Sequence, residues 1–223
     1  MVMPVKRPRR NSRWYFSAGV VLVVALVIVA VRLVEQIGPD RALTDRFVVA
    51  RIVDGDTVEL RGGDVLRLLA IDTPEKGEPF YHEAADLLRE LSFNKTAKIE
   101  FAGSRRDKYG RLLGYLYADS LFVNREILRH GLGYLYLFRD NELKQDRVRL
   151  LLEAQRQAMR DKVGLWSLKR EPEEYYVQKA GSFRLHRPGC RSVANLREGN
   201  YRVFQTREEG LATGLSPCRN CKP

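Results

Sequence analysis

Three short acidic motifs, each next to a strand-like apolar run, are the strongest constraint on the fold of this chain. They are Asp54-Gly55-Asp56-Thr57-Val58, Arg67-Leu68-Leu69-Ala70-Ile71-Asp72-Thr73-Pro74-Glu75 and Asp107-Lys108-Tyr109-Gly110-Arg111. Within about sixty residues they bring carboxylates that can hold a hard cation next to arginines that can bind a phosphate. This combination indicates metal-assisted hydrolysis of a phosphodiester.

Each motif alone also has an ordinary structural explanation. The first fits a hairpin turn, in which Asp and Gly are common. The second fits a helix start with Thr73 as the cap and Pro74 at the first position. The third fits a solvated turn between strands. The occurrence of all three in one order favours the functional explanation.

The apolar pattern predicts an α+β fold. Strands are expected at 47–53, 57–60, 65–71, 96–101 and 112–117, with helices at 79–92, 123–130 and 141–162. Gly131 and Gly164 are expected to end the last two helices. This order is typical of a five-stranded Greek-key barrel of the OB-fold class that carries additional helices.

The three motifs and their spacing resemble the staphylococcal nuclease (thermonuclease) family from Phe47 to Trp166, which predicts a nuclease domain at 45–168. The resemblance implies a calcium ion held by Asp56, Asp72 and the carbonyl of Thr73. It implies Glu75 as the general base, with Arg67 and Arg111 holding the phosphate. Positions near the nucleotide would be Lys108, Tyr109, Tyr134 and Tyr136. The implied products carry 3′-phosphate ends.

A second candidate metal site lies near the C-terminus. His186 and Cys190, then Cys218 and Cys221, give H-x3-C and C-x2-C pairs. One imidazole and three thiolates predict a closed structural Zn²⁺ site in a module at 181–223, after a linker at 169–180. The alternative is a disulfide between two of the cysteines, with His186 unrelated.

This segment also resembles the N-terminal zinc domain of the Ada family of DNA-methyl-repair proteins. The shared features are an Arg-Pro-x-Cys-Arg turn and the closing Pro-Cys-x-x-Cys-x-Pro. That family has its methyl-accepting cysteine where this chain has His186. The resemblance therefore implies zinc-supported DNA binding rather than methyl transfer.

The net charge of +11 is concentrated at the two ends of the chain. The tail before residue 14 carries +5, the segment after residue 177 carries +6, and the segment between them is close to neutral. A polyanionic partner is expected from this balance. The C-terminal module, rather than the nuclease domain, is predicted to supply most of the electrostatic attraction to nucleic acid.

Trp14 to Val31 is an uncharged, mostly aliphatic run. As a helix it would be about 27 Å long, close to the thickness of a bilayer core. A transmembrane anchor is therefore predicted at 14–34, with the basic residues 1–13 in the cytoplasm and the rest of the chain outside it. The alternative is a cleaved secretory signal and a secreted protein.

The sequence therefore predicts a membrane-anchored, extracytoplasmic, Ca²⁺-dependent nuclease acting on DNA, RNA or both. The alternative is a non-catalytic protein that captures nucleic acid at the cell surface. A zinc-dependent repair or regulatory protein is disfavoured by the export signal and by His186. No motif indicates a protein partner.

Overall fold

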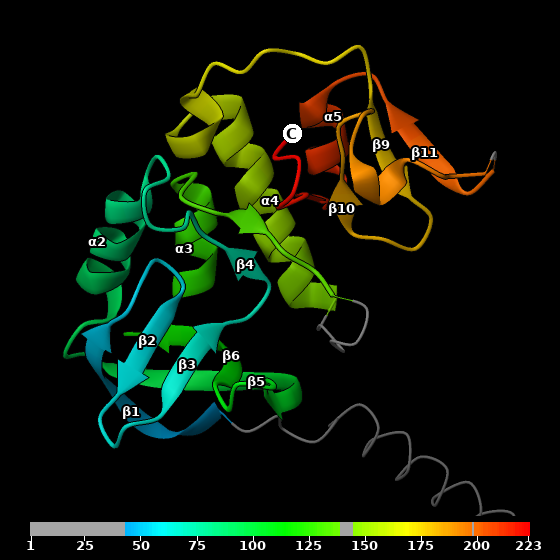
Figure 1. The fold of residues 1–223 in the computed structure, drawn as a ribbon. Coiled ribbons are helices and arrows are strands. Elements are labelled where there is room, and N and C mark those ends of the chain that lie inside the picture. The colour runs from blue at the N-terminus through cyan, green and yellow to red at the C-terminus, as the bar shows by residue number, and fades with distance from the viewer. Residues whose placement is uncertain (1–42, 139–144, 198) are drawn as a thin grey trace, which may run out of the picture. The chain divides into compact units, whose positions relative to one another are not determined.

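Five strands close into a barrel in the computed structural model, which describes residues 43–138, 145–197 and 199–223 (Figure 1). An antiparallel meander and a hairpin make up the barrel. The strands are β1 (Leu43–Ile52), β2 (Thr57–Leu60), β3 (Val65–Leu68), β5 (Thr96–Arg106) and β6 (Leu112–Ala118). β5 pairs with β1, and a parallel pairing of β3 with β6 closes the barrel. The predicted five-stranded barrel and the α+β class are confirmed.

The strands around the active-site motifs alternate between the barrel interior and its surface, as the period of two requires. Val58 and Leu60 on β2, and Leu66 and Leu68 on β3, are at most 1% exposed. Arg67 lies between two of these buried residues, and its side chain is mostly buried. The alternation that fills the core therefore also places Arg67 on the outer face of the barrel.

The third strand is shorter than the predicted run 65–71. β3 ends at Leu68, and β4 (Ile71–Asp72) pairs instead with β8 (Tyr134–Leu135). Between them Ala70 has a φ of 63°, a left-handed conformation that costs a residue with a side chain about 1–2 kcal/mol. The carbonyl of Ala70 accepts from the N–H of Tyr136 at 2.9 Å. Apolar periodicity cannot reveal this break, because the residues on both sides of it are buried.

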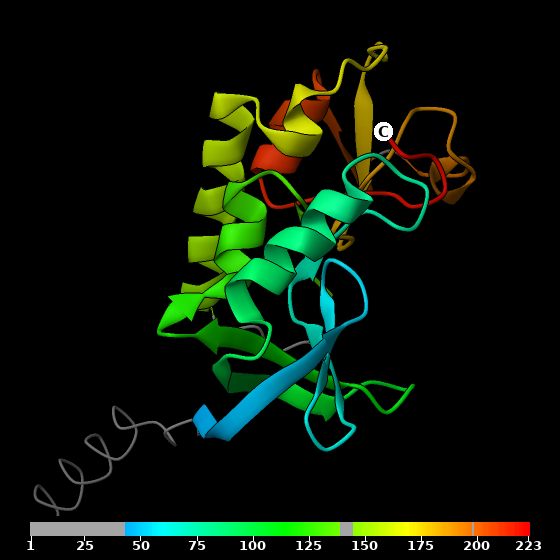
Figure 2. The same cartoon turned by 90° about the vertical axis from the view of Figure 1, so that its left-hand side faces the viewer.

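Three helices stand together at one end of the barrel (Figure 2). They are α2 (Tyr81–Ser92), α3 (Val123–Arg129) and α4 (Gln145–Asp161). A helix start at Thr73 is excluded, because α2 begins only at Tyr81. Asn124 of α3 is fully buried, accepts from the N–H of Leu116 and donates to the carbonyl of Leu69, both at 2.9 Å. It thereby fixes the backbone where β3 ends.

The C-terminal part is a small set of short elements. A short helical turn, η1 (Gly164–Ser167), precedes it. Its elements are β9 (Tyr176–Lys179), β10 (Arg184–Leu185), the turn η2 (Arg191–Val193), β11 (Tyr201–Phe204), α5 (Arg207–Ala212) and β12 (Ser216–Pro217). β9 pairs with β11, although β9 falls inside the segment 169–180 predicted as a linker.

Residues 43–223 form one compact unit. Gln155 of α4 is fully buried and ties its two parts together. Its side chain accepts from the N–H of Leu135 at 2.7 Å and donates to the carbonyl of Leu211 at 2.9 Å. Helix α4 and strand β8 therefore share buried polar contacts with the C-terminal elements.

The membrane anchor predicted at 14–34 and the basic tail 1–13 lie outside the described residues. In the part of the chain that the structure describes, no helix has the length and apolar character needed to cross a membrane.

Candidate active site and metal cluster

Asp56 is a buried carboxylate in the turn between β1 and β2. Its Oδ2 accepts from the backbone N–H and the hydroxyl of Thr73, at 2.9 and 3.0 Å, and its Oδ1 accepts from the Thr57 hydroxyl at 3.0 Å. Gly55 permits this close approach, because a Cβ there would lie 2.6 Å from the Cβ of Ala84 and 2.7 Å from Thr73 Oγ1. The first and second motifs are thus directly bonded to each other.

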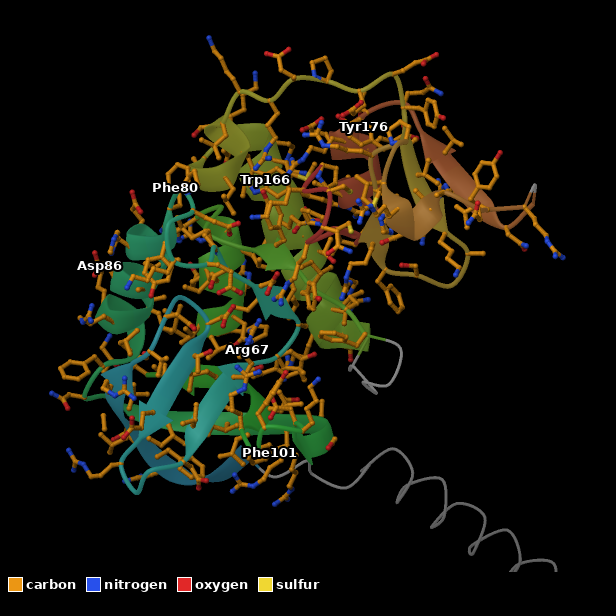
Figure 3. The ribbon with its side chains drawn as sticks, in the orientation of Figure 1. Arg67, Phe80, Asp86, Phe101, Trp166 and Tyr176 are labelled. Carbon is orange, nitrogen blue, oxygen red and sulfur yellow. The ribbon has the colours of Figure 1, made fainter. Side chains whose placement is uncertain are left out.

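Arg67 joins the two predicted calcium ligands. Its Nη2 lies 3.1 Å from Asp56 Oδ2 and 3.1 Å from Asp72 Oδ1. Its Nη1 donates to the carbonyls of Leu68 and Ile71, which holds the guanidinium near the end of β3, where Figure 3 labels it. Oxygens of both carboxylates are therefore within reach of a single atom, as the ligands of one cation must be.

Burial raises the pKa of Asp72 above its usual value, and the bonds from Arg219 and Arg67 oppose this shift. Burial, followed by the charge of Asp56, also raises the pKa of Asp54. Asp54 accepts from the N–H of Asp56 at 3.0 Å. The motif predicts Asp54 only as a turn residue, whereas the structure has it as a third carboxyl group beside the predicted ligands.

Glu75, the predicted general base, is placed at the edge of this group. Its side chain is 73% exposed, and its Oε1 lies 3.9 Å from Arg219 Nη2. The backbone turn is fixed locally, since the N–H of Glu75 donates to Glu78 Oε2 and the N–H of Glu78 donates to the carbonyl of Glu75, both at 2.9 Å. The carboxylate can therefore contact solvent water from a defined position.

Arg111 is held by the third motif rather than by the carboxylates. Its guanidinium and its backbone N–H both bond to Asp107, at 2.8 and 3.0 Å. Burial acts to raise the pKa of Asp107, but the bonds from Arg111 outweigh it and the pKa is lowered. The parallel register pairs Arg67 with Leu113. Arg111 precedes the first residue of β6 and lies two positions before Leu113, so it is on the same face of the barrel as Arg67.

Lys108 and Tyr109 occupy the exposed tip of the same turn. The Tyr109 ring is 72% exposed, with Lys108 Nζ 4.9 Å from its centre. This ring is open to an incoming ligand.

The other two tyrosines predicted to lie near the nucleotide contact the C-terminal elements. The hydroxyl of Tyr134 accepts from Arg207 at 2.9 Å, and its ring meets Trp166 edge-on. The Tyr136 ring has the Arg184 guanidinium 3.7 Å above its centre and that of Arg219 at 5.3 Å. The structure thus places Tyr134 in the packing beneath the module, and Tyr136 among its arginines.

The contacts of Arg219 are the main feature of this site that the motifs do not predict. Its Nη2 donates to Asp72 Oδ1 at 2.5 Å, and the neighbouring Lys222 bonds to Glu78. These contacts span a cleft of about 760 Å³ that runs between Asp72–Pro79 and Pro217–Pro223. The basic charge of the C-terminal segment was a signal for a role in binding. No local pattern, however, relates residues 147 positions apart.

The predicted zinc ligands come together. One potential ligand atom from each of His186, Cys190, Cys218 and Cys221 lies within 4.8 Å of the others. The three cysteines are free, so no disulfide forms among the residues described. His186 Nδ1 is buried and lacks a hydrogen-bond partner within the described chain, as a metal-ligand nitrogen would without its ion. Burial lowers the pKa of His186 and favours the neutral imidazole that metals bind.

Known proteins of similar sequence give independent evidence about this site. The family profile described as "Staphylococcal nuclease homologue" matches residues 65–168. A thermonuclease of Staphylococcus hyicus is 29% identical over 167 residues, which cover 68% of this chain and 97% of that protein. An uncharacterized endonuclease of Escherichia coli is 36% identical over 123 residues, covering 53% of this chain and 75% of that protein.

Endonuclease YncB of Bacillus subtilis is 36% identical over 128 residues, but the match covers only 59% of its length. The profile ends at residue 168, so the cysteine-containing module lies beyond it.

Proposed function

The chain belongs to the staphylococcal nuclease family, and on that premise we propose that it hydrolyses phosphodiester bonds of DNA, RNA or both with a calcium ion at Asp56 and Asp72. The nuclease activity follows from relatives that are named thermonuclease and endonuclease. The main support for the calcium site is that the carboxylates of Asp56 and Asp72 both contact Arg67 Nη2, beside the exposed Glu75.

The donor set fits calcium. Asp56 and Asp72 offer carboxylate oxygens on turns, and the carbonyl of Thr73 is on the residue that already bonds to Asp56. Oxygen ligands on turns suit the flexible coordination of Ca²⁺ better than the strict octahedron of Mg²⁺. The bound cation would polarise a phosphoryl oxygen and neutralise charge as it develops.

The chain's own residues account for the remaining steps. Glu75 would orient a water molecule and take its proton, while the water oxygen forms a bond to phosphorus. One ester P–O bond breaks, and the leaving oxygen takes a proton from solvent. Arg67 and Arg111 lie on one face, and their guanidinium groups would donate N–H groups to phosphoryl oxygens, for which guanidinium is better suited than ammonium. Tyr109 and Lys108 can contact the adjoining nucleotide.

Two substitutions test this assignment. Glu75→Gln and Arg111→Ala should each lower turnover by about a hundredfold or more, because each removes one group that acts on the transition state. Both side chains are outside the core, so thermal melting should change little. Glu83→Gln, an exposed carboxylate on α2, is the matched control and should cleave normally. The measurement is the rate of plasmid nicking with Ca²⁺, with Mg²⁺ and with chelator.

The alternative function, capture of nucleic acid without cleavage, makes the opposite prediction. Binding without nicking in Ca²⁺ would support it. Near-normal turnover of both variants would show that the catalytic assignment is wrong.

We also propose that His186, Cys190, Cys218 and Cys221 bind one structural Zn²⁺. The convergence of the four ligand atoms and the unpartnered Nδ1 of His186 support this site. The module resembles a DNA-binding zinc domain and carries much of the positive charge. Mass spectrometry under native conditions should find one zinc per chain. The affinity for a 30-mer duplex should fall steeply with salt, as phosphate contacts release counterions.

Anchoring by residues 14–34, with the nuclease outside the cytoplasm, remains part of the proposal. Its support is the apolar run from Trp14 to Val31 and the basic tail before it. Protease treatment of intact cells tests it. Digestion of the nuclease part with survival of a short membrane-bound fragment is expected, whereas full protection would contradict the orientation.

A further inference from the structure

Arg219 brings a second guanidinium to the group formed by Asp56, Asp72 and Arg67. Its Nη2 is 2.5 Å from Asp72 Oδ1 and 3.9 Å from Glu75 Oε1. These are the proposed metal ligand and the proposed base, respectively. A residue of the C-terminal module therefore stands inside the catalytic cleft.

Two arginines share Asp72 Oδ1, but the structure holds them differently. The Arg67 side chain is only 14% exposed, and its Nη1 is held by hydrogen bonds to two backbone carbonyls. Arg219 is 56% exposed, and the contacts found for its guanidinium in the described chain are two carboxylates and the Tyr136 ring. Arg67 is therefore fixed, whereas Arg219 can exchange one anionic partner for another.

We propose that Arg219 is a phosphate-binding residue of the nuclease site, an inference that rests on the proposed function. A divalent cation on Asp72 would neutralise the carboxylate that Arg219 pairs with and would repel the guanidinium. A phosphodiester entering the cleft offers two oxygens in the planar arrangement that the guanidinium fork matches. Arg219 then turns from Asp72 to the substrate, on the side of the cleft opposite the barrel.

The zinc cluster positions this arginine. Arg219 lies in the turn between Cys218 and Cys221, where the N–H of Lys222 donates to the carbonyl of Cys218 at 2.8 Å. The N–H of Arg187 lies 3.4 Å from Cys221 Sγ. A metal bound by both cysteines would fix the turn, and with it the position from which the side chain reaches Asp72. The module thus takes part in the active site in addition to attracting long nucleic acid.

The test uses the full chain and a tetranucleotide with phosphorothioate linkages, which keep the phosphate charge but resist hydrolysis. Its few phosphates limit the contacts that it can make with the other arginines of the module. In saturating Ca²⁺, Arg219→Ala should weaken its binding by about tenfold or more, and Arg219→Lys should weaken it less. Arg219→Ala should also require less Ca²⁺ for half-maximal binding, since a competing cation has left Asp72.

Arg202→Ala is the matched control. Arg202 is an exposed arginine of the same module. It lies on the strand β11, and its guanidinium packs over the Phe204 ring. This variant removes the same charge and should bind the tetranucleotide within twofold of the unmodified chain. Zinc content, measured by mass, should remain one per chain in all three variants. If Arg219→Ala loses zinc, Arg219→Lys with zinc retained decides the question.

Unchanged tetranucleotide affinity in Arg219→Ala would overturn the proposal. Faster cleavage by that variant at saturating Ca²⁺ would also overturn it, because it would show that Arg219 only blocks the site. If the unmodified chain does not cleave nucleic acid, the proposed function fails by itself. A loss of affinity in Arg219→Ala would even then show that the arginine contacts phosphate.

Discussion

At the scale of single residues, Gly55 determines whether the first two motifs can meet. The Thr73 hydroxyl and the Ala84 side chain pack against its Cα, in the space that a Cβ would need. Gly55→Ala should therefore destabilise the protein by about 1–3 kcal/mol through overpacking. It should also displace Thr73 from Asp56 and lower the cleavage rate by about tenfold or more, because small displacements at a site are costly.

Chemical denaturation and a nicking assay measure the two effects. Gly189→Ala is the control, since no atom of the described chain outside its immediate neighbours lies within 4 Å of the position that its Cβ would take. It should leave the stability of the barrel and the cleavage rate unchanged. Wild-type cleavage by Gly55→Ala would show that the bond between Thr73 and Asp56 does not matter for the site.

At the scale of elements, the break between β3 and β4 directs Asp72 toward β8. Asn124 supports this break with two buried bonds, to Leu116 and to Leu69. Asn124→Ala should cost about 2–5 kcal/mol, because it leaves a buried N–H and a buried carbonyl unpaired. Ca²⁺-dependent cleavage should be lost together with stability. Leu69 adjoins the strained Ala70, and this break in the strand directs the proposed calcium ligand Asp72.

Thermal melting and Ca²⁺ titration of cleavage are the measurements for this variant. Asn200 is exposed, so Asn200→Ala is the control and should melt within about a degree or two of the unmodified chain. If Asn124→Ala does not fold, Asn124→Asp keeps the acceptor for Leu116 and loses only the donor. A melting temperature unchanged in both variants would contradict the proposed support.

The elements also show what a single sequence can predict. The barrel strands and the α2 and α3 helices follow the local periodicity of apolar residues. The turns that carry Asp56 and Asp107 are predicted by their Asp and Gly residues. The end of β3 depends on Asn124 and Tyr136, which are more than fifty positions further along the chain and leave no local pattern. The contact of Arg219 with Asp72 has the same origin, because burial and charge pairing between distant segments follow only from the complete fold.

At the scale of the whole molecule, the module shares an interior with the nuclease domain through β8 and η1. Arg207 is only 4% exposed and donates to the Tyr134 hydroxyl at 2.9 Å and to the carbonyl of Pro223 at 2.7 Å. Leu211 and Phe204 of the module belong to one apolar cluster, against which Tyr134 and Trp166 pack. The removal of residues 178–223 would therefore expose apolar surface at Tyr134 and Trp166 rather than leave an independent nuclease.

This shared interior predicts how the protein responds to loss of zinc. A small module depends on its metal for folding free energy, and α4, β8 and η1 pack on that module. A zinc-selective chelator should therefore lower the melting temperature of the whole unit by about 10 °C or more. Calorimetry should show one transition before and after chelation, with Ca²⁺ present throughout. Without chelator, Cys190→Ser should already melt at the lower temperature, and the chelator should not change its melting temperature further.

Two separate transitions, of which only the smaller one responds to the chelator, would show that the module and the barrel fold independently. In that case the zinc could not set the position of Arg219 in the cleft.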